Sequence, residues 1–476
     1  MGVEGTYKPT SWQAIHNATH PIEGAGNTSF SNVVLGGVVV GLPLTFTYYL
    51  GLPWLFFFPL ALLFALPSLA SVIYLYSRFA PRNRTNIKLP GKPLEDYMTI
   101  HDPELKKQYY GYNKIPMETF FEAYFVGKID IKGDILETFE LRHDWAAFQF
   151  TLGQFKFFLT QWIPETLWHS RDQDENQVRD HYDRGDDFYE AFLGPRMVYT
   201  SGIVSDPKKR ETLEEMQDNK MELICNKIQL KKGEKHLDIG SGWGTLTAYA
   251  AKHFGSDSTG VTLAKKQTEY GNNRCAEWGV KDHARIKCMD YRDIPTETKY
   301  DKITCVEMAE HVGLLRFDSF LNDVRERLDD DGLFYMQVAG LRATWQYEDF
   351  IWGLFMGRYI FPGADASTPL YWYIRKLEIN GFEIQNVDTV GVHYSSTLEK
   401  WYLNWMKNRD EIRAKYGDKI TRVWDIFLAW STIISRQGSA TCFQIVANKN
   451  RNAFDRAALI NNRTNAAVWK VDNKTE

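Results

Sequence analysis

The chain has 476 residues, a formal net charge of −4 and 24% charged residues. This average composition excludes a disordered chain, a collagen-like chain and a polytopic protein made mostly of membrane spans. Because acidic residues slightly outnumber basic ones, the net charge disfavours nucleic acid as a partner. The five cysteines form no C-x-x-C pair, so the sequence predicts neither a disulfide framework nor a metal site.

An uncharged run is the first distinctive feature of the chain. It begins within a polar N-terminal segment (1–32), which lacks the pattern of a secretory signal peptide. Residues 24–77 contain no Asp, Glu, Lys, Arg or His over 54 positions. Within that run, residues 33–52 and 54–76 each reach the length of about 20 residues that a bilayer span needs. We therefore expect two transmembrane helices within 33–77, the alternative being a buried hairpin of a soluble core.

Positive charges directly after the uncharged run predict its orientation. Arg78, Arg82 and Arg84 follow it, and positive loops stay on the cytosolic side of a membrane. Two spans then return the N-terminus to the same side. The glycosylation patterns at 17–19 and 27–29 would be unused in this topology.

Aromatic residues gather in the next region, a predicted membrane-proximal helical segment over 78–179. Residues 139–168 form one expected helical stretch with few charges. It contains Phe148, Phe150, Phe155, Phe157, Phe158, Trp162 and Trp168. Such a helix either lies on the bilayer or packs into a core, and the sequence leaves both open.

From about residue 232 strands alternate with helices, which predicts an α/β domain with a parallel sheet. This domain is expected over 180–450, and a polar tail follows at 451–476. The expected strands are 235–239, a second ending at 258–262, a third shortly before residue 290, 302–306 and 333–338.

A glycine-rich turn, G-S-G-W-G at 240–244, follows the first of these strands and precedes a helix. Such a turn lets a cofactor approach the backbone closely. The second strand ends without an acidic residue, which disfavours a dinucleotide site. Polar residues follow the other strands as well, and the carboxyl ends of parallel strands share one edge of a sheet. The sequence therefore predicts a ligand site at that edge.

Six motifs occur in the order seen in the cyclopropane-fatty-acid synthases, and residues 180–447 resemble that family. The motifs are H-Y-D at 181–183, M-V-Y-T-S at 197–201, L-D-I-G-S-G-W-G at 237–244, G-V-T-L at 260–263, E-H-V-G at 310–313 and Y-I-F-P-G at 359–363. With the N-terminal hairpin, which bacterial members lack, the chain resembles the fungal sphingolipid C9-methyltransferases.

The resemblance implies a class I SAM-dependent methyltransferase domain, Rossmann-like, preceded by the two-helix transmembrane hairpin. It implies methylation of C9 in the 8-unsaturated sphingoid base of ceramide or glucosylceramide, a membrane lipid. We expect a multi-pass protein of the endoplasmic reticulum whose catalytic domain is cytosolic. A cyclopropane synthase acting on phospholipid acyl chains and an inactive lipid-binding protein are the alternatives.

The resemblance also implies which residues bind S-adenosyl-L-methionine (SAM). Gln267 is the expected ribose contact in place of the missing acid, and Tyr291 with Arg292 would flank the adenine. The full expected set is Tyr199, Thr200, Asp238, Gly240, Ser241, Gly242, Thr262, Leu263, Ala264, Lys265, Lys266, Gln267, Tyr291 and Arg292.

In the same family a bound bicarbonate serves as the base, held by Cys, Glu, His and Tyr side chains. Glu310 and Tyr394 match that set, whereas Ser201 stands at the Cys position and Gln337 at the His position. Because Gln337 cannot become a cation, we expect bicarbonate to be held more weakly. Glu310, His311 or Tyr394 then remains as the base. A rearranged base favours proton loss from a chain carbon, which gives a branched alkene, over loss from the new methyl, which closes a ring.

Overall fold

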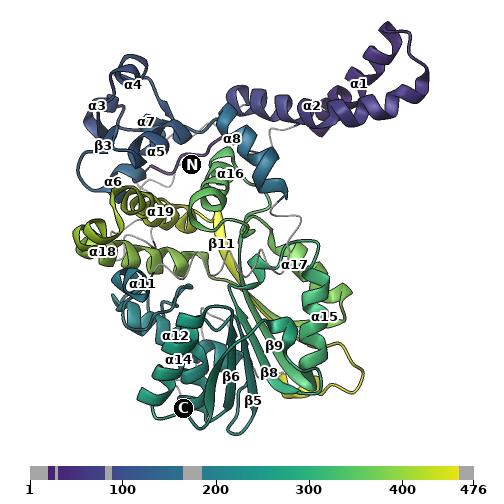
Figure 1. The fold of residues 1–476 in the computed structure, drawn as a ribbon, viewed down its shortest axis with the longest axis vertical. Coiled ribbons are helices and arrows are strands. Elements are labelled where there is room, and N and C mark those ends of the chain that lie inside the picture. The colour runs from purple at the N-terminus through teal and green to yellow at the C-terminus, as the bar shows by residue number, and fades with distance from the viewer. Residues whose placement is uncertain (1–14, 16–19, 27–30, 81–87, 165–184, 460–476) are drawn as a thin grey trace. The chain divides into compact units, whose positions relative to one another are not determined.

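The computed structural model describes residues 15, 20–26, 31–80, 88–164 and 185–459 (Figure 1). It divides into two compact units. Among the described residues, unit 1 comprises 20–163 with Thr344–Phe355, and unit 2 comprises residue 15, 164–343 and 356–459.

Several predictions fall on residues outside this description. They are the H-Y-D motif at 181–183, the arginines Arg82 and Arg84, the glycosylation patterns at 17–19 and 27–29, and Trp168.

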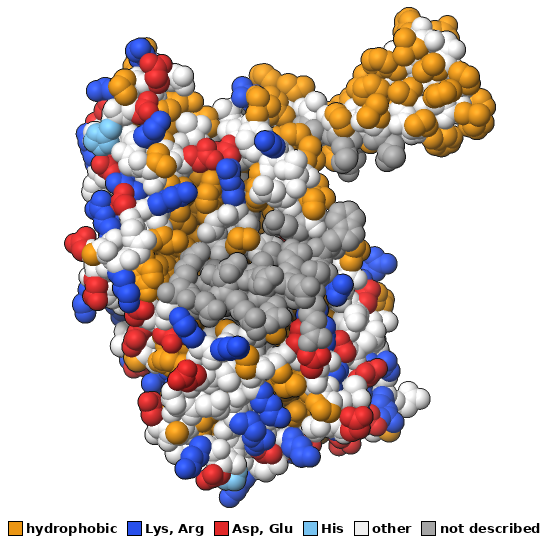
Figure 2. Space-filling view, in the orientation of Figure 1, with side chains coloured by type: hydrophobic (Ala, Val, Ile, Leu, Met, Phe, Trp, Pro, Cys, Tyr) orange, Lys and Arg blue, Asp and Glu red, His pale blue; other side chains and the backbone are white. Residues whose placement is uncertain are grey.

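The uncharged run folds into a helical hairpin at the start of unit 1. Helix α1 (Asn32–Tyr49) and helix α2 (Phe57–Phe79) lie side by side, joined through the short helix η3 (Trp54–Phe56). Gly51 has φ +61°, a left-handed conformation that glycine adopts without strain and that lets the chain reverse. Figure 2 shows the visible surface of the hairpin as almost continuously hydrophobic. The two predicted helices are therefore present.

Membrane crossing is a separate question from helix formation. Within the described ranges, no single helix is both long and apolar enough to cross a bilayer. The segments Trp54–Ala61 and Leu63–Phe79 meet the length and composition only as a pair, bent by 43°, and Val33–Tyr49 is a shorter apolar helix. The transmembrane character of the hairpin thus stays a prediction.

The remainder of unit 1 consists of short elements around an aromatic core. Phe120 packs against Phe139 and Trp145 with ring centroids 5.9 and 4.8 Å away. Arg142 and His143 both bind the buried carboxylate of Glu348, and this ion cluster attaches the 344–355 segment to the unit. The elements are α3 (Leu94–Tyr97), β1 (Met98–Ile100), α4 (Pro103–Gln108), β2 (Ile115–Pro116), α5 (Met117–Phe125), β3 (Ile129–Ile131), α6 (Ile135–Glu140), α7 (Arg142–Trp145), β4 (Ala146–Ala147), α8 (Leu152–Phe157), η4 (Phe158–Trp162) and α16 (Tyr347–Phe355).

The expectation of one continuous helix over the aromatic stretch is wrong. The stretch is split because β4 pairs in parallel with β2, and a capping box of Thr151 and Gln154 starts α8 afresh. Phe150 and Phe157 are buried and pack with Tyr347. These aromatic residues therefore contribute to the core of unit 1.

Unit 2 contains a seven-stranded sheet in the order β10-β11-β9-β8-β5-β6-β7. The five expected strands are present as β5 (Lys235–Ile239), β6 (Asp257–Thr262), β7 (Ala284–Cys288), β8 (Tyr300–Val306) and β9 (Leu328–Leu341), and they run parallel. The predicted parallel arrangement is confirmed for these five strands, and two further strands complete the sheet. Strand β11 (Ala440–Lys449) pairs antiparallel with both β9 and β10 (Phe382–Thr389), so the sheet is mixed. After β10 the chain passes through two long helices, α18 (Gly391–Tyr416) and α19 (Asp418–Arg436), and β11 returns between β9 and β10.

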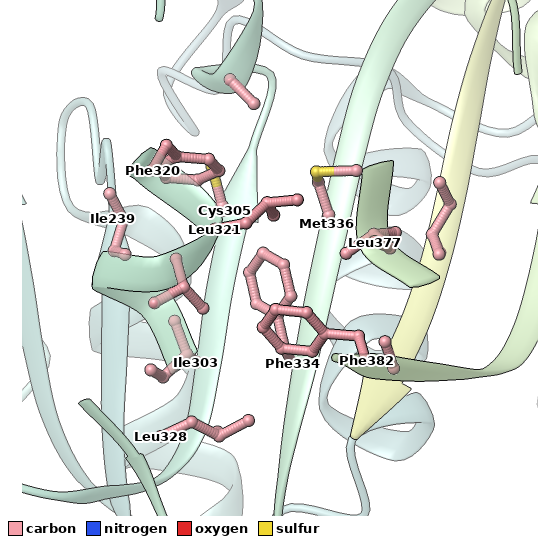
Figure 3. Close-up of a cluster of buried hydrophobic side chains, with 14 of the residues drawn as sticks. Ile239, Ile303, Cys305, Phe320, Leu321, Leu328, Phe334, Met336, Leu377 and Phe382 are labelled. Carbon is pink, nitrogen blue, oxygen red and sulfur yellow. The ribbon is translucent and has the colours of Figure 1, made fainter. Parts of the chain in front are cut away.

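Helices bury both faces of the sheet. On one face, Phe320 of α15 and Leu377 of α17 pack with Ile303, Phe334 and Phe382 of the strands (Figure 3). Burying such a side chain contributes about 1.5–3 kcal/mol. Another cluster brings α12 and α13 against β9. The further helices of unit 2 are α11 (Asp186–Leu193), α12 (Leu213–Lys227), α13 (Thr245–Tyr249), η5 (Ala250–Phe254), α14 (Lys265–Glu277), η6 (Tyr291–Asp293), η7 (Ala309–His311), α15 (Phe317–Arg327), η8 (Met356–Ile360), α17 (Leu370–Ile379) and η9 (Arg456–Leu459).

Candidate active site

The glycine-rich turn lies between β5 and α13 in unit 2. Gly240 has φ +77°, and a Cβ there would lie 2.6 Å from the Cβ of Met308. Gly244 has φ +74°, and a Cβ there would come within 3.0 Å of the Cα of Gly271 on α14. Gly240 therefore allows the close approach of the β5 and β8 loops, whereas Gly244 allows close packing of the turn against α14.

Two hollows open beside this turn at the carboxyl ends of the parallel strands. Both are lined by Gly240, Gly242, Gln267 and Glu307, so they adjoin one another. The first also includes Thr262, Leu263, Tyr291, Arg292 and His311, and the second also includes Tyr199, Thr200, Lys220, Asp238 and Ser241. Most of the residues expected to bind the cofactor thus line a shared cleft. Ala264, Lys265 and Lys266 stand at the start of α14, outside the lining of these two hollows.

Buried polar groups lie beneath the cleft. Thr304 and Thr247 donate hydrogen bonds of 2.9 and 3.1 Å to the carboxylate of Asp238, whose pKa burial raises to about 6. Thr262 donates to the Gln267 side-chain carbonyl at 2.7 Å. Within the described residues the buried Ser241 hydroxyl has no hydrogen-bond partner. Because an unsatisfied buried hydroxyl is costly, Ser241 fits a ligand-binding position.

Lys220 is a cleft residue absent from the sequence-based set. It lies on α12, its ammonium binds the Thr200 hydroxyl, and burial lowers its pKa to about 8. The sequence held a signal for it, because Lys220 falls four residues after Met216 and four before Ile224, on the apolar face of its helix. A lysine in such a position needs a partner of opposite charge or a polar ligand.

Glu307 is the residue directly after β8. Three side chains and one backbone amide surround its carboxylate. Oε1 accepts hydrogen bonds from Gln337 Nε2 at 2.6 Å and from the Ser201 amide at 3.2 Å. Oε2 accepts one from the Tyr394 hydroxyl at 2.9 Å. The Cys442 thiol lies 3.6 Å from Oε1. Three of the expected catalytic residues, Ser201, Gln337 and Tyr394, are thus brought together around Glu307, which sequence reasoning missed.

Glu310 lies on η7, after the end of β8 as expected, and is outside the lining of the two hollows. Its Oε1 accepts the Ala339 amide at 2.5 Å, and within the described residues Oε2 is buried without a hydrogen-bond partner. Burial, reinforced by the charge of Glu307, raises the pKa of Glu310 to about 8. His311 follows on η7 and lines the first hollow, 6.2 Å from the Phe361 ring. Glu310 is therefore largely a neutral acid at pH 7.

The arrangement combines an open cleft beside a glycine turn with a carboxylate held by fixed donors. A cleft of this kind can bind an elongated cofactor along the strand ends. A fixed carboxylate can stabilise a developing positive charge or accept a proton.

Comparison with known proteins adds the family. Residues 169–445 match the family model described as mycolic acid cyclopropane synthetase. A sphingolipid C9-methyltransferase of Komagataella phaffii is 55% identical, over 95% of this chain and 94% of that protein. The one of Candida albicans is 52% identical, over 94% of this chain and 89% of that protein.

Solved structures confirm the predicted class I methyltransferase fold. The cyclopropane synthase MmaA2 from Mycobacterium tuberculosis has a TM-score of 0.53 at 23% identity, covering 58% of this chain and 98% of its own. The cyclopropane synthase CmaA1, complexed with SAH and CTAB, gives 0.53 at 24% identity over the same shares. At this identity the likeness concerns the fold.

Proposed function

The chain belongs to the mycolic acid cyclopropane synthetase family and is a SAM-dependent methyltransferase, and we propose that it methylates C9 of the sphingoid base of a sphingolipid. The observation that carries the proposal is the 50–55% identity, over nearly the whole chain, to several proteins named sphingolipid C9-methyltransferase. A phospholipid cyclopropane synthase is less favoured, because the sequence identity to the cyclopropane synthases MmaA2 and CmaA1 is only 22–24%.

The cleft fits SAM, which supplies an electrophilic methyl group when bound. The buried Ser241 hydroxyl and the Lys220 ammonium would bind the amino-acid end of the cofactor, Lys220 pairing with its carboxylate. Gln267 would hold the ribose. Tyr291, after β7, would lie against the adenine. The roles of Gln267 and Tyr291 are those that the resemblance to the family implies, and both residues line the cleft.

The acceptor alkene is a weak nucleophile, so the protein has to stabilise the positive charge that develops on it. Carboxylates near the cleft serve this purpose, and Glu307 lines both hollows. Proton loss from a neighbouring chain carbon then leaves a branched alkene as the product. An inactive lipid-binding protein would have no use for this buried, charge-bearing arrangement, which costs stability.

We also propose that the hairpin is embedded in the endoplasmic reticulum membrane, with the catalytic domain on the cytosolic side. Large apolar side chains on it are highly exposed, among them Val33 at 85%, Tyr48 at 82% and Trp54 at 68%. Soluble proteins rarely expose so continuous an apolar surface. Arg78 at the end of α2 supports the cytosolic orientation. Retention in the pellet after alkaline extraction, and protease sensitivity of unit 2 in sealed microsomes, would test both parts.

The function is tested by deleting the gene in its host and analysing the sphingoid bases by mass spectrometry. We expect bases lighter by one methylene group, with the methylated form restored by re-expression. The restored product should keep an olefin. A cyclopropane ring in the product would contradict the proposed proton loss, and unchanged sphingoid bases would contradict the acceptor.

A further inference from the structure

Glu307 is fixed in place by its backbone and by its side chain. Its φ of +52° is a left-handed conformation that costs a non-glycine residue of order 1–3 kcal/mol. The Glu307 amide donates to the Gln337 carbonyl at 2.7 Å, which ties the turn to β9. Strain of this kind persists only where the surroundings determine the position, and here it directs the carboxylate toward the cleft.

The main donor to Glu307 is itself oriented by two neighbours. Tyr335 donates to Gln337 Oε1 at 2.7 Å, and Gln444 Nε2 donates to the same oxygen at 3.1 Å. With its carbonyl bound on that side, the Gln337 amide presents Nε2 to Glu307. Gln337 is therefore a positioning residue, and a histidine is not needed to hold this carboxylate.

Bicarbonate does not fit this arrangement. Gln337 and Tyr394 stand where the family holds the ion, yet both side chains already bind the Glu307 carboxylate. Ser201 binds the same carboxylate through its backbone amide, and its hydroxyl accepts a hydrogen bond from Gln337 Nε2 at 3.4 Å. An added anion would lose those donors and would lie beside a like charge, which is strongly unfavourable at short range in a partly buried site. The donor set is therefore satisfied by the chain itself.

We propose that Glu307 is the catalytic base of the reaction, a built-in carboxylate that takes the place of the family's bicarbonate. This inference rests on the proposed methyl transfer to an alkene. The alkene π pair forms the new C–CH₃ bond while the S–CH₃ bond breaks and leaves its electron pair on sulfur. The resulting carbocation loses a proton from the adjacent chain carbon to a Glu307 oxygen, and the C–H pair becomes the new double bond.

Glu310 supports this role as a neighbour. Burial raises the pKa of Glu310 to about 8, and its carboxylate accepts the Ala339 amide, whereas the Gln337 and Tyr394 side chains both donate to Glu307. Since Glu307 lines both hollows and is half-buried, its proton can pass to solvent after turnover.

The first test compares full-length Glu307→Gln and Glu307→Gly with Glu326→Gln, which makes the same change at an exposed position on α15. In carbonate-free buffer both Glu307 variants should lose about 10²–10⁴-fold in turnover, the range of general-base catalysis. Thermal unfolding and SAH binding should remain close to those of the wild type, and Glu326→Gln should be fully active. Near-normal turnover of Glu307→Gln would overturn the proposal.

The second test asks whether bicarbonate can replace the side chain. Glu307→Gly removes the carboxylate and suits the left-handed φ, leaving the donors to an added ion. Millimolar bicarbonate should raise the unfolding temperature of Glu307→Gly and restore part of its turnover, and should change neither property in the wild type. Bicarbonate dependence of wild-type turnover would overturn the proposal.

Failure of the proposed function would look different. If the wild type bound SAH but methylated no sphingolipid, the acceptor would be wrong. Because bicarbonate-dependent stabilisation needs no lipid, it would still report whether Glu307 occupies the anion position. No such stabilisation of Glu307→Gly would overturn that assignment whatever the acceptor.

Discussion

The hairpin of unit 1 and the strand ends of unit 2 depart from ordinary protein surfaces and interiors in opposite ways. The hairpin exposes large apolar side chains, whereas the strand ends bury Asp238, Glu310 and Lys220. Each departure costs free energy in a soluble globular protein. Under the proposed function, the exposed apolar surface would face lipid and the buried charged groups would surround the reacting atoms.

The largest effect is expected at the glycine turn. Gly240→Ala would place a Cβ 2.6 Å from Met308 in the lining of both hollows, so SAH affinity should fall by more than about 100-fold. Gly279→Ala is the matched control, because its φ of +74° is equally left-handed and its Cβ meets nothing within 4 Å. Calorimetric titration with SAH measures the difference. Equal losses in both variants would mean that backbone strain, and not the cleft, decides the outcome.

The hairpin offers the next largest effect. Leu44→Asp places a charge on the exposed surface of α1, and insertion scales give about 2.5–3.5 kcal/mol for an acidic residue at the middle of a membrane helix. We expect more of this variant in the alkaline-soluble fraction than of the wild type. Leu315→Asp, at an exposed leucine of unit 2, should fractionate like the wild type. If Leu44→Asp stayed in the membrane pellet as fully as the wild type, this apolar surface would not be what binds the membrane.

Lys220 should show a smaller effect on the cofactor alone. Lys220→Met keeps the length of the side chain and removes the charge, so SAH affinity should fall by about 10–100-fold if the ammonium binds the cofactor carboxylate. Unfolding curves would check that the variant stays folded. Lys281→Met, an exposed change, serves as the control. Unaltered SAH affinity would exclude this pairing.

A further expected effect concerns the dependence of stability on pH. The pKa of Glu310 is raised by folding from 4.5 to about 8, so the folded protein holds a proton that the unfolded chain has lost between these values. Its contribution to stability is complete below pH 4.5 and is lost as the pH rises to about 8, at up to about 1.4 kcal/mol per pH unit. Glu310→Gln should flatten that decline in thermal unfolding, and Glu326→Gln should not. An identical slope in Glu310→Gln and the wild type would contradict the buried, protonated state.

Much of this molecule could be predicted from local patterns. The two helices of the hairpin could be predicted from composition alone, because their 54-residue run is uncharged and largely apolar. The alternation of strands with helices predicted strands β5 to β9. Five motifs lie within the described residues of unit 2, and most of the expected cofactor residues line the cleft there. The helix boundaries within the aromatic stretch could not be predicted, because strand pairing between β2 and β4 interrupts it.

Only the tertiary structure decided which of two nearby glutamates faces the donors. Glu307 and Glu310 lie three residues apart in one loop, and both follow the same strand. The left-handed φ of Glu307, and the register that sets Gln337 beside it, are long-range consequences of β8 pairing with β9. The antiparallel return of β11, which brings Cys442 and Gln444 to the same cluster, is likewise invisible in local sequence. The sequence by itself determined the chemistry available at the strand ends, and packing decided which carboxylate receives the hydrogen bonds of Gln337 and Tyr394.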